Sequence, residues 1–103
     1  MNKSRKNIQD QLNVMRKIVE YPNLSQRDLA AKLGFSLGKL NYCLKELKVK
    51  GFVKMNNFKK NKNKMKYIYV LTPGGIAAKT KLTINFMKRK MQEYDELKKE
   101  ITE

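Results

Sequence analysis

Residues 25–47, SQRDLAAKLGFSLGKLNYCLKEL, contain two short helical patterns that meet at one glycine. Ser25 and Ser36 stand where N-caps are expected, and Asp28, three places after Ser25, completes a pattern that resembles a capping box. Gly34 can adopt the left-handed conformation that ends a helix. Two helices joined by a tight, glycine-containing turn are typical of a helix-turn-helix. This unit is therefore the first structural prediction.

The side chains of this unit divide into an inward and an outward set. The inward positions suit a small core, with Ala30 where the helices cross: Leu29, Leu33, Phe35, Leu40 and Cys43. The apolar stripe of the second helix is Leu37, Leu40, Cys43, Leu44 and Leu47. Its outward positions are Ser36, Leu37, Gly38, Asn41, Tyr42 and Lys45. A DNA groove would meet this outward face, whereas two packed helices of an unrelated bundle are the alternative.

The rest of the chain predicts two helices and a hairpin. An amphipathic helix precedes Pro22, with a stripe made of Ile8, Leu12, Met15, Ile18 and Val19. After Gly51, residues 52–58 and 66–71 have strand composition, and residues 59–65 form a long, polar, flexible tip. Thr72 and Pro73 then begin a long helix. The predicted fold is mainly α with a small β-hairpin, a winged helix-turn-helix with a long C-terminal dimerisation helix.

The last helix has an apolar seam at spacings of four and three residues. The positions are Thr80, Ile84, Met87, Met91, Tyr94, Lys98 and Ile101. This repeat is typical of a short coiled coil, and we expect Ile84, Met87, Met91, Tyr94 and Ile101 to mediate dimerisation. The sequence thus divides into residues 1–72, a DNA-binding domain, and residues 73–103, a dimerisation helix.

The charge of the chain is large and unevenly distributed. The formal net charge is +15, and residues 47–92 contain twelve lysines, one arginine and no acid. Residues 93–103 contain five acids and two lysines. An ordinary solvated surface is one interpretation. A basic segment of this length favours a polyanionic partner, and nucleic acid is the first candidate.

Individual residues can be assigned DNA contacts on this hypothesis. Asn41 could pair with adenine, and Lys39 or Lys45 could contact guanine or a phosphate. Tyr42 could contact a thymine methyl group or a phosphate, and Gly38 allows a close approach to a groove. Phosphate contacts are expected from Ser36, Gln26, Arg27 and the hairpin lysines Lys59, Lys60, Lys62 and Lys64.

The residue types argue against other classes of protein. The chain has no histidine and one cysteine, so the commonest general base and the usual zinc ligand sets are missing. No phosphate-binding loop motif is present. We therefore expect no enzyme activity, no metal and no cofactor. No apolar run approaches the ~20 residues of a membrane span, and a single cysteine fits a reducing cytoplasm.

Residues 24–75 resemble winged helix-turn-helix regulators of the MarR type, chiefly in the stretches LKVKGFV and LTPGG. The stretches SLGKLNY and FMKRKMQEY resemble a small MarR-like branch associated with exopolysaccharide gene clusters. The resemblance implies a homodimeric, cytoplasmic transcription regulator that binds double-stranded DNA at a roughly palindromic operator. It does not identify a small-molecule effector.

The hairpin departs from this family, because NNFKKNKNKMK lacks the aspartate and arginine of MarR-type wings. Two other functions therefore stay open: a sequence-tolerant basic nucleic-acid-binding module, and a winged-helix module that binds a protein.

Overall fold

The computed structural model describes the backbone of residues 2–61 and 64–102 and the side chains of residues 5–56 and 67–102. The elements are α1 (Asn2–Glu20), α2 (Gln26–Leu33), α3 (Leu37–Val49), β1 (Val53–Asn61), β2 (Lys64–Leu71) and α4 (Pro73–Thr102). The predicted order of three helices, a hairpin and a long helix is confirmed. The described chain has a winged helix-turn-helix fold.

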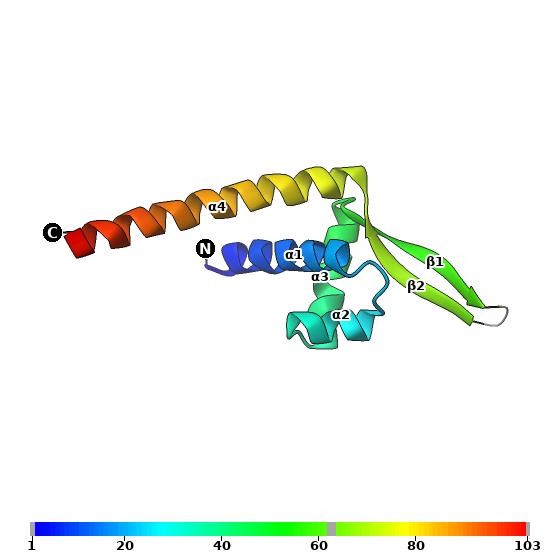
Figure 1. Cartoon of the computed structure of the whole chain (residues 1–103). Coiled ribbons are helices and arrows are strands. Elements are labelled where there is room, and N and C mark those ends of the chain that lie inside the picture. The colour runs from blue at the N-terminus through cyan, green and yellow to red at the C-terminus, as the bar shows by residue number, and fades with distance from the viewer. Residues whose placement is uncertain (1, 62–63, 103) are drawn as a thin grey trace.

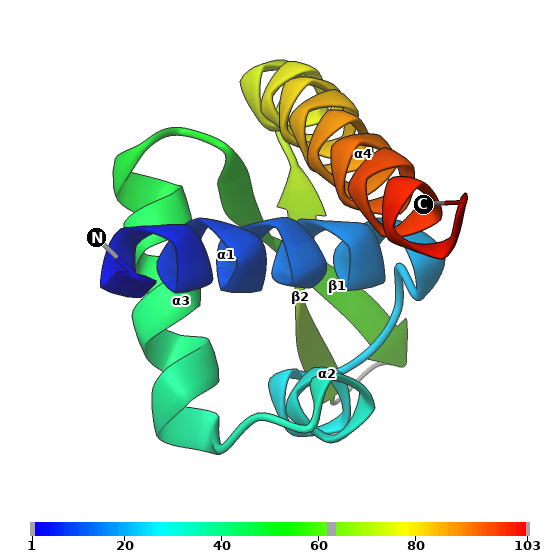
Figure 2. The same cartoon turned by 90° about the vertical axis from the view of Figure 1, so that its left-hand side faces the viewer.

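The elements form a compact body with two projections (Figure 1). Helices α1, α2 and α3 pack together, the β1–β2 hairpin extends to one side, and α4 runs the other way above α1. Viewed almost along α4, α3 crosses α1 steeply, and α2 lies below α1 and beside the lower end of α3 (Figure 2). The hairpin and α4 give the molecule its extents of 67 × 25 × 24 Å.

The helix-turn-helix forms as its capping residues predict. The Ser25 hydroxyl accepts a hydrogen bond from the Asp28 amide at 3.2 Å, and the Ser36 hydroxyl accepts one from the Lys39 amide at 3.1 Å. Gly34 has φ +70°, and the next amide, of Phe35, bonds the Ala30 carbonyl at 2.9 Å. A residue with a Cβ would be strained at this φ, so the turn depends on glycine.

The core lies where α1, α2, α3 and the base of the hairpin meet. It contains Val14, Met15, Ile18, Leu29, Ala30, Leu40, Cys43, Leu44, Leu47, Val53 and Tyr69. Leu33 and Phe35 pack against it and are partly buried. All the predicted inward positions of the helix-turn-helix therefore contact the core.

Three predicted core positions are wrong, because Ile8, Val19 and Leu37 are exposed. Ile8 is 40% and Val19 52% exposed, although Leu12 and Met15 on the same side of α1 are buried. Ile8 and Val19 both lie nearer the ends of α1, Val19 next to its last residue, beyond the stretch from Gln11 to Ile18 in which the buried residues of this helix lie. Leu37 is exposed because it opens α3, beyond the edge of the packed region. Leu37 was assigned both to the apolar stripe and to the outward face of this helix, and only the outward assignment is correct.

The hairpin is longer than predicted. Its antiparallel pairing runs from Val53 opposite Leu71 to Asn61 opposite Lys64, with an irregularity between Lys59 and Asn61. The proposed tip of residues 59–65 is therefore mostly strand. Backbone pairing can continue through lysine and asparagine since these side chains need no burial, and lysine is common on exposed edges. Residues 62 and 63 lie outside the described residues.

Hydrogen bonds and a close backbone contact hold the start of α4 against the residues that follow α3. The Thr72 hydroxyl accepts from the Gly75 amide at 3.0 Å and donates to the Gly51 carbonyl. Gly75 is buried, and a Cβ there would lie 1.9 Å from the carbonyl oxygen of Phe52. Glycine is required by this close approach, and it fixes the direction in which α4 leaves the body.

Candidate nucleic-acid interface

The outward face of α3 is open along its length. Its predicted members are all exposed: Ser36, Leu37, Gly38, Asn41, Tyr42 and Lys45. The opposite side of the helix holds Leu40, Cys43, Leu44 and Leu47, which are buried. Because α3 is anchored on its apolar side, its polar side is presented in a fixed orientation. This is the geometry that groove binding by a recognition helix requires.

Asn41 is joined to the preceding helix. The Gln26 side-chain amide donates a hydrogen bond to Asn41 Oδ1 across the helix-turn-helix. Gln26 opens α2, so the bond links the start of α2 to the middle of the α3 face. The Asn41 NH₂ group keeps its donor capacity, and Oδ1 keeps a second lone pair. The sequence placed both residues near DNA but did not predict this contact.

Lys39 and Lys45 differ in where their charges lie. The Lys39 ammonium is 3.3 Å from an Asp10 carboxylate oxygen on α1 and 4.1 Å from the centre of the Phe35 ring. Lys45 is exposed. In the unbound chain Lys39 therefore contacts α1, and a DNA contact by Lys39 would require it to leave Asp10.

A polar network at the end of α3 was not predicted from the sequence. Glu46 accepts hydrogen bonds from the Asn7 side-chain amide at 3.0 Å and from the Gln11 side-chain amide, and Lys50 donates to Gln11 at 2.8 Å. The Tyr42 hydroxyl also donates a hydrogen bond to Glu46. This bond and the one from Asn7 lower the pKa of Glu46, and the bond to Glu46 raises the pKa of Tyr42. The signal that could have found this network is that Glu46 is the one acid in α3.

The hairpin, which we call the wing, is attached to α3 at its base. Val53 and Tyr69 are buried, and the Lys48 ammonium lies 5.4 Å from the centre of the Tyr69 ring. The backbones of Lys59, Lys60 and Lys64 belong to the two strands. Their side chains, and the whole of Lys62, lie outside the described residues. Arg27, at the second position of α2, is exposed, as a phosphate contact requires.

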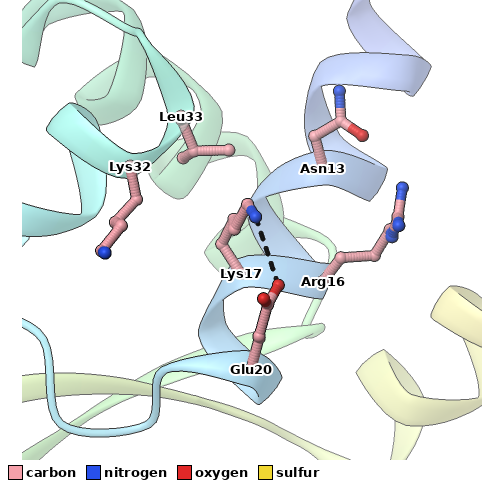
Figure 3. A pocket seen from close by; sticks show the side chains of 6 residues that line it. All are labelled: Asn13, Arg16, Lys17, Glu20, Lys32 and Leu33. Carbon is pink, nitrogen blue, oxygen red and sulfur yellow. Dashed lines mark hydrogen bonds and ion pairs between the residues drawn. The ribbon is translucent and has the colours of Figure 1, made fainter.

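A basic hollow separates α1 from α2 (Figure 3). Its lining is Asn13, Arg16, Lys17, Glu20, Lys32 and Leu33, and Lys17 pairs with Glu20 at 3.2 Å. Lys17 and Lys32 also approach the Tyr21 ring, at 5.6 and 4.7 Å from its centre. Three cations against one carboxylate make the hollow better suited to an anion than to a cation.

The distal part of α4 leaves its apolar seam uncovered. Ile84, Met87, Met91, Tyr94 and Ile101 are all exposed, as is Leu97, which the seam prediction omitted. From Met87 to Thr102 every residue is exposed, whereas Leu82 packs against the core. The seam residues thus project from the protomer.

The described residues were also compared with what a metal site, a reactive cysteine and a membrane-spanning helix require. Within them, no three histidine, cysteine or acidic side chains are grouped so as to hold a metal ion. Cys43 is buried, and burial raises the pKa of its thiol, which disfavours a reactive thiolate. In the same ranges no helix has the length and apolar content that a membrane crossing requires.

Comparison with known protein families defines the class. Residues 4–54 match the family described as winged helix-turn-helix DNA-binding, a segment that runs from α1 into β1. This matched segment, like the fold described above, is similar to winged helix-turn-helix DNA-binding domains. A search of curated protein sequences gives no match.

Solved structures place the fold more narrowly. A MarR family transcription regulator is 17% identical with a TM-score of 0.67, over 90% of this chain and 68% of that one. A MepR variant of Staphylococcus aureus is 17% identical with a TM-score of 0.69, over 98% of this chain and 86% of that one. Another MepR variant, bound to an oligodeoxyribonucleotide, is 17% identical with a TM-score of 0.65, over 90% of this chain and 73% of that one. The chain therefore has the fold of MarR family regulators.

Proposed function

We propose that this protein is a cytoplasmic transcription regulator of the MarR type that binds double-stranded DNA sequence-specifically, as a homodimer on a roughly palindromic operator. The observation that supports this best is the exposed polar face of α3, held in place by the buried side of the same helix. Asn41 and Tyr42 are its central side chains, and both are suited to contacts with base edges.

The contacts around this face divide into two kinds. Ser36, Gln26 and Arg27 stand at the starts of α3 and α2, where contacts to phosphates are favoured. Lys45 and the wing lysines add positive charge beside the groove. Such contacts fix the position of the protein on the duplex, while specificity comes from the bases.

Dimerisation through α4 is the second part of the proposal. One helix-turn-helix contacts only a few base pairs, so useful specificity requires two that lie about one helical turn apart. The uncovered seam from Ile84 to Ile101 supports α4 as the dimerisation element. We accordingly assign residues 1–72 to DNA binding and residues 73–103 to association.

The regulated genes are proposed from the sequence resemblance alone. SLGKLNY and FMKRKMQEY lie at the start of α3 and in distal α4, and they resemble the branch associated with exopolysaccharide clusters. We therefore propose polysaccharide biosynthesis genes as the targets. We propose no catalytic role, no cofactor and no metal.

A sequence-tolerant nucleic-acid-binding module is the second candidate. It is favoured by a wing whose cations are all lysines, because lysine is less suited than arginine to a narrow minor groove. This candidate needs no contact between the α3 face and the bases.

The substitution Asn41→Ala tests between the two candidates. On a duplex selected from a random pool, removal of a bidentate hydrogen-bonded pair with a base should cost about 1–3 kcal/mol of discrimination, while binding to random duplex changes little. Asn85→Ala, the same change at an exposed position of α4, is the matched control. Equal weakening on both duplexes would contradict base readout by Asn41.

A further inference from the structure

We infer that α4 pairs with α4 of a second copy in antiparallel orientation, so that the basic half of each helix faces the acidic half of the other. The basic half is residues 79–90 and the acidic half is residues 93–102. This inference rests on the homodimer proposed above and adds the direction of pairing, which determines how the two DNA-binding domains are separated.

The face in question is apolar and lacks a cover within the described chain. Met87, Met91, Tyr94 and Leu97 are each more than half exposed on one continuous 30-residue helix. Burial of such side chains is favourable, at roughly 25 cal/mol for each Å² removed from water. A second copy offers the same seam, and a twofold pair of copies is the commonest closed assembly.

The distribution of charge along α4 selects the direction. Residues 79–90 contain five cations and no acid, whereas residues 93–102 contain four acids and two lysines. In a parallel pair the two basic halves would lie side by side and repel. In an antiparallel pair centred between Met91 and Tyr94, residues 83–92, which hold three of these cations, lie against residues 93–102 of the partner subunit, so that the interaction is attractive at both ends.

Lys98 gives a second, independent argument, because it occupies a seam position. A parallel pair would place Lys98 in the same layer as Lys98 of the partner subunit, with two like charges inside the seam. An antiparallel pair centred between Met91 and Tyr94 places Lys98 opposite Met87 of the partner subunit. The flexible thioether can pack on the lysine stem while the ammonium reaches water.

The residues that flank the seam agree with this register. Lys88 and Asp95 are seven residues apart on the same edge of the seam. Equivalent edges face each other in an antiparallel pair, so Lys88 lies near Asp95 of the partner subunit, and the contact occurs twice. In a parallel pair the edge facing Lys88 holds Thr83 and Lys90, which offer it no carboxylate.

Cysteine cross-linking of the full-length chain tests the direction. In the antiparallel register Ile84 lies opposite Ile101 of the partner subunit, and a disulfide forms only where two Cβ atoms are close. Chains with Ile84→Cys and chains with Ile101→Cys are mixed, re-equilibrated and oxidised. We expect a linked dimer in the mixture that neither variant gives alone. The wild-type chain, whose Cys43 is buried, is the control.

Each other outcome overturns the inference. A linked dimer from Ile84→Cys alone would indicate parallel pairing. No link in any sample, while the wild-type chain sediments as a dimer, would remove α4 from the interface and leave the homodimer standing. A wild-type chain that sediments as a monomer would overturn the homodimer as well. If the seam variants fail to associate when reduced, Lys88→Cys and Asp95→Cys at the edge repeat the test, with the same outcomes decisive.

Discussion

The apolar side chains of the two long helices, α1 and α4, differ in whether they are buried within the protomer. In α1, Leu12, Val14 and Met15 are buried beneath elements of the same chain. In α4, apolar residues from Met87 onward are exposed. Both helices are amphipathic, so the sequence pattern alone does not distinguish them. What differs is whether the chain itself supplies a partner, and this separates the residues that stabilise the protomer from those that we propose associate two protomers.

The largest effect is expected at the joint between these two regions. Gly75→Ala would place a Cβ 1.9 Å from a backbone carbonyl oxygen, so α4 or the end of α3 must move. We expect a decrease of roughly 3 kcal/mol or more in the free energy of unfolding. Gly74→Ala is the control, because its Cβ would have only ordinary contacts at 3.7 Å. Thermal unfolding followed by circular dichroism compares the two, and equal melting temperatures would refute the tight joint.

The same substitution in both helices tests the comparison itself. Met15 is 0% exposed and Met91 is 63% exposed. Met15→Ala leaves a cavity and should cost about 2–5 kcal/mol. Met91→Ala should change protomer stability by no more than about 0.5 kcal/mol but should weaken association. Urea unfolding at low protein concentration measures protomer stability, and sedimentation measures association. Equal destabilisation of the protomer by both changes would contradict the assignment of Met15 to protomer stability and of Met91 to association.

The wing should contribute affinity without specificity. Replacing Lys59, Lys60, Lys62 and Lys64 by glutamine should weaken binding to all duplexes alike. It should also reduce the slope of log K against log salt by about one unit for each phosphate that the wing no longer neutralises. Lys99→Gln, at an exposed position of α4 outside the seam, gives the effect of removing one positive charge away from the wing. An unchanged slope in the wing variant would mean that the tip does not touch DNA.

The smallest effect is expected at the Glu46 network. Hydrogen bonds from Tyr42 and Asn7 lower the pKa of Glu46 below its ordinary value of 4.5. The stabilisation they provide is therefore present above pH 4.5 and is lost as the pH falls below that value through the lowered pKa. Glu46→Gln should flatten the acid limb of stability against pH, and Glu100→Gln should not. Identical acid limbs in both variants would show that the network contributes nothing.

The sequence predicted the elements well because their signals are local. Ser25, Gly34 and Ser36 act within one turn of the backbone, and Pro73 fixes the start of α4 through its own geometry. The outward face of α3 followed from helical periodicity for the same reason. Positions controlled by distant neighbours were harder: Ile8 and Val19 were assigned to the core, although the buried residues of α1 lie only between Gln11 and Ile18.

The contacts around the candidate site could not be predicted, since they join residues far apart in the chain. Asp10 pairs with Lys39 across 29 positions, and Asn7 bonds Glu46 across 39. Each depends on the angle at which α1 crosses α3, which periodicity does not specify. The hairpin length was missed for a different reason, because strand pairing of polar residues leaves no hydrophobic signal.

Selection of a binding site from a random duplex pool is the decisive test of sequence-specific binding by a homodimer. The ratio of affinities for the selected duplex and for random duplex would be measured at one fixed salt concentration. We predict an inverted repeat, with half-sites separated by a whole number of helical turns, bound at least ~10³-fold more tightly than random sequence. A ratio near one, with no repeat recovered, would contradict the proposed function.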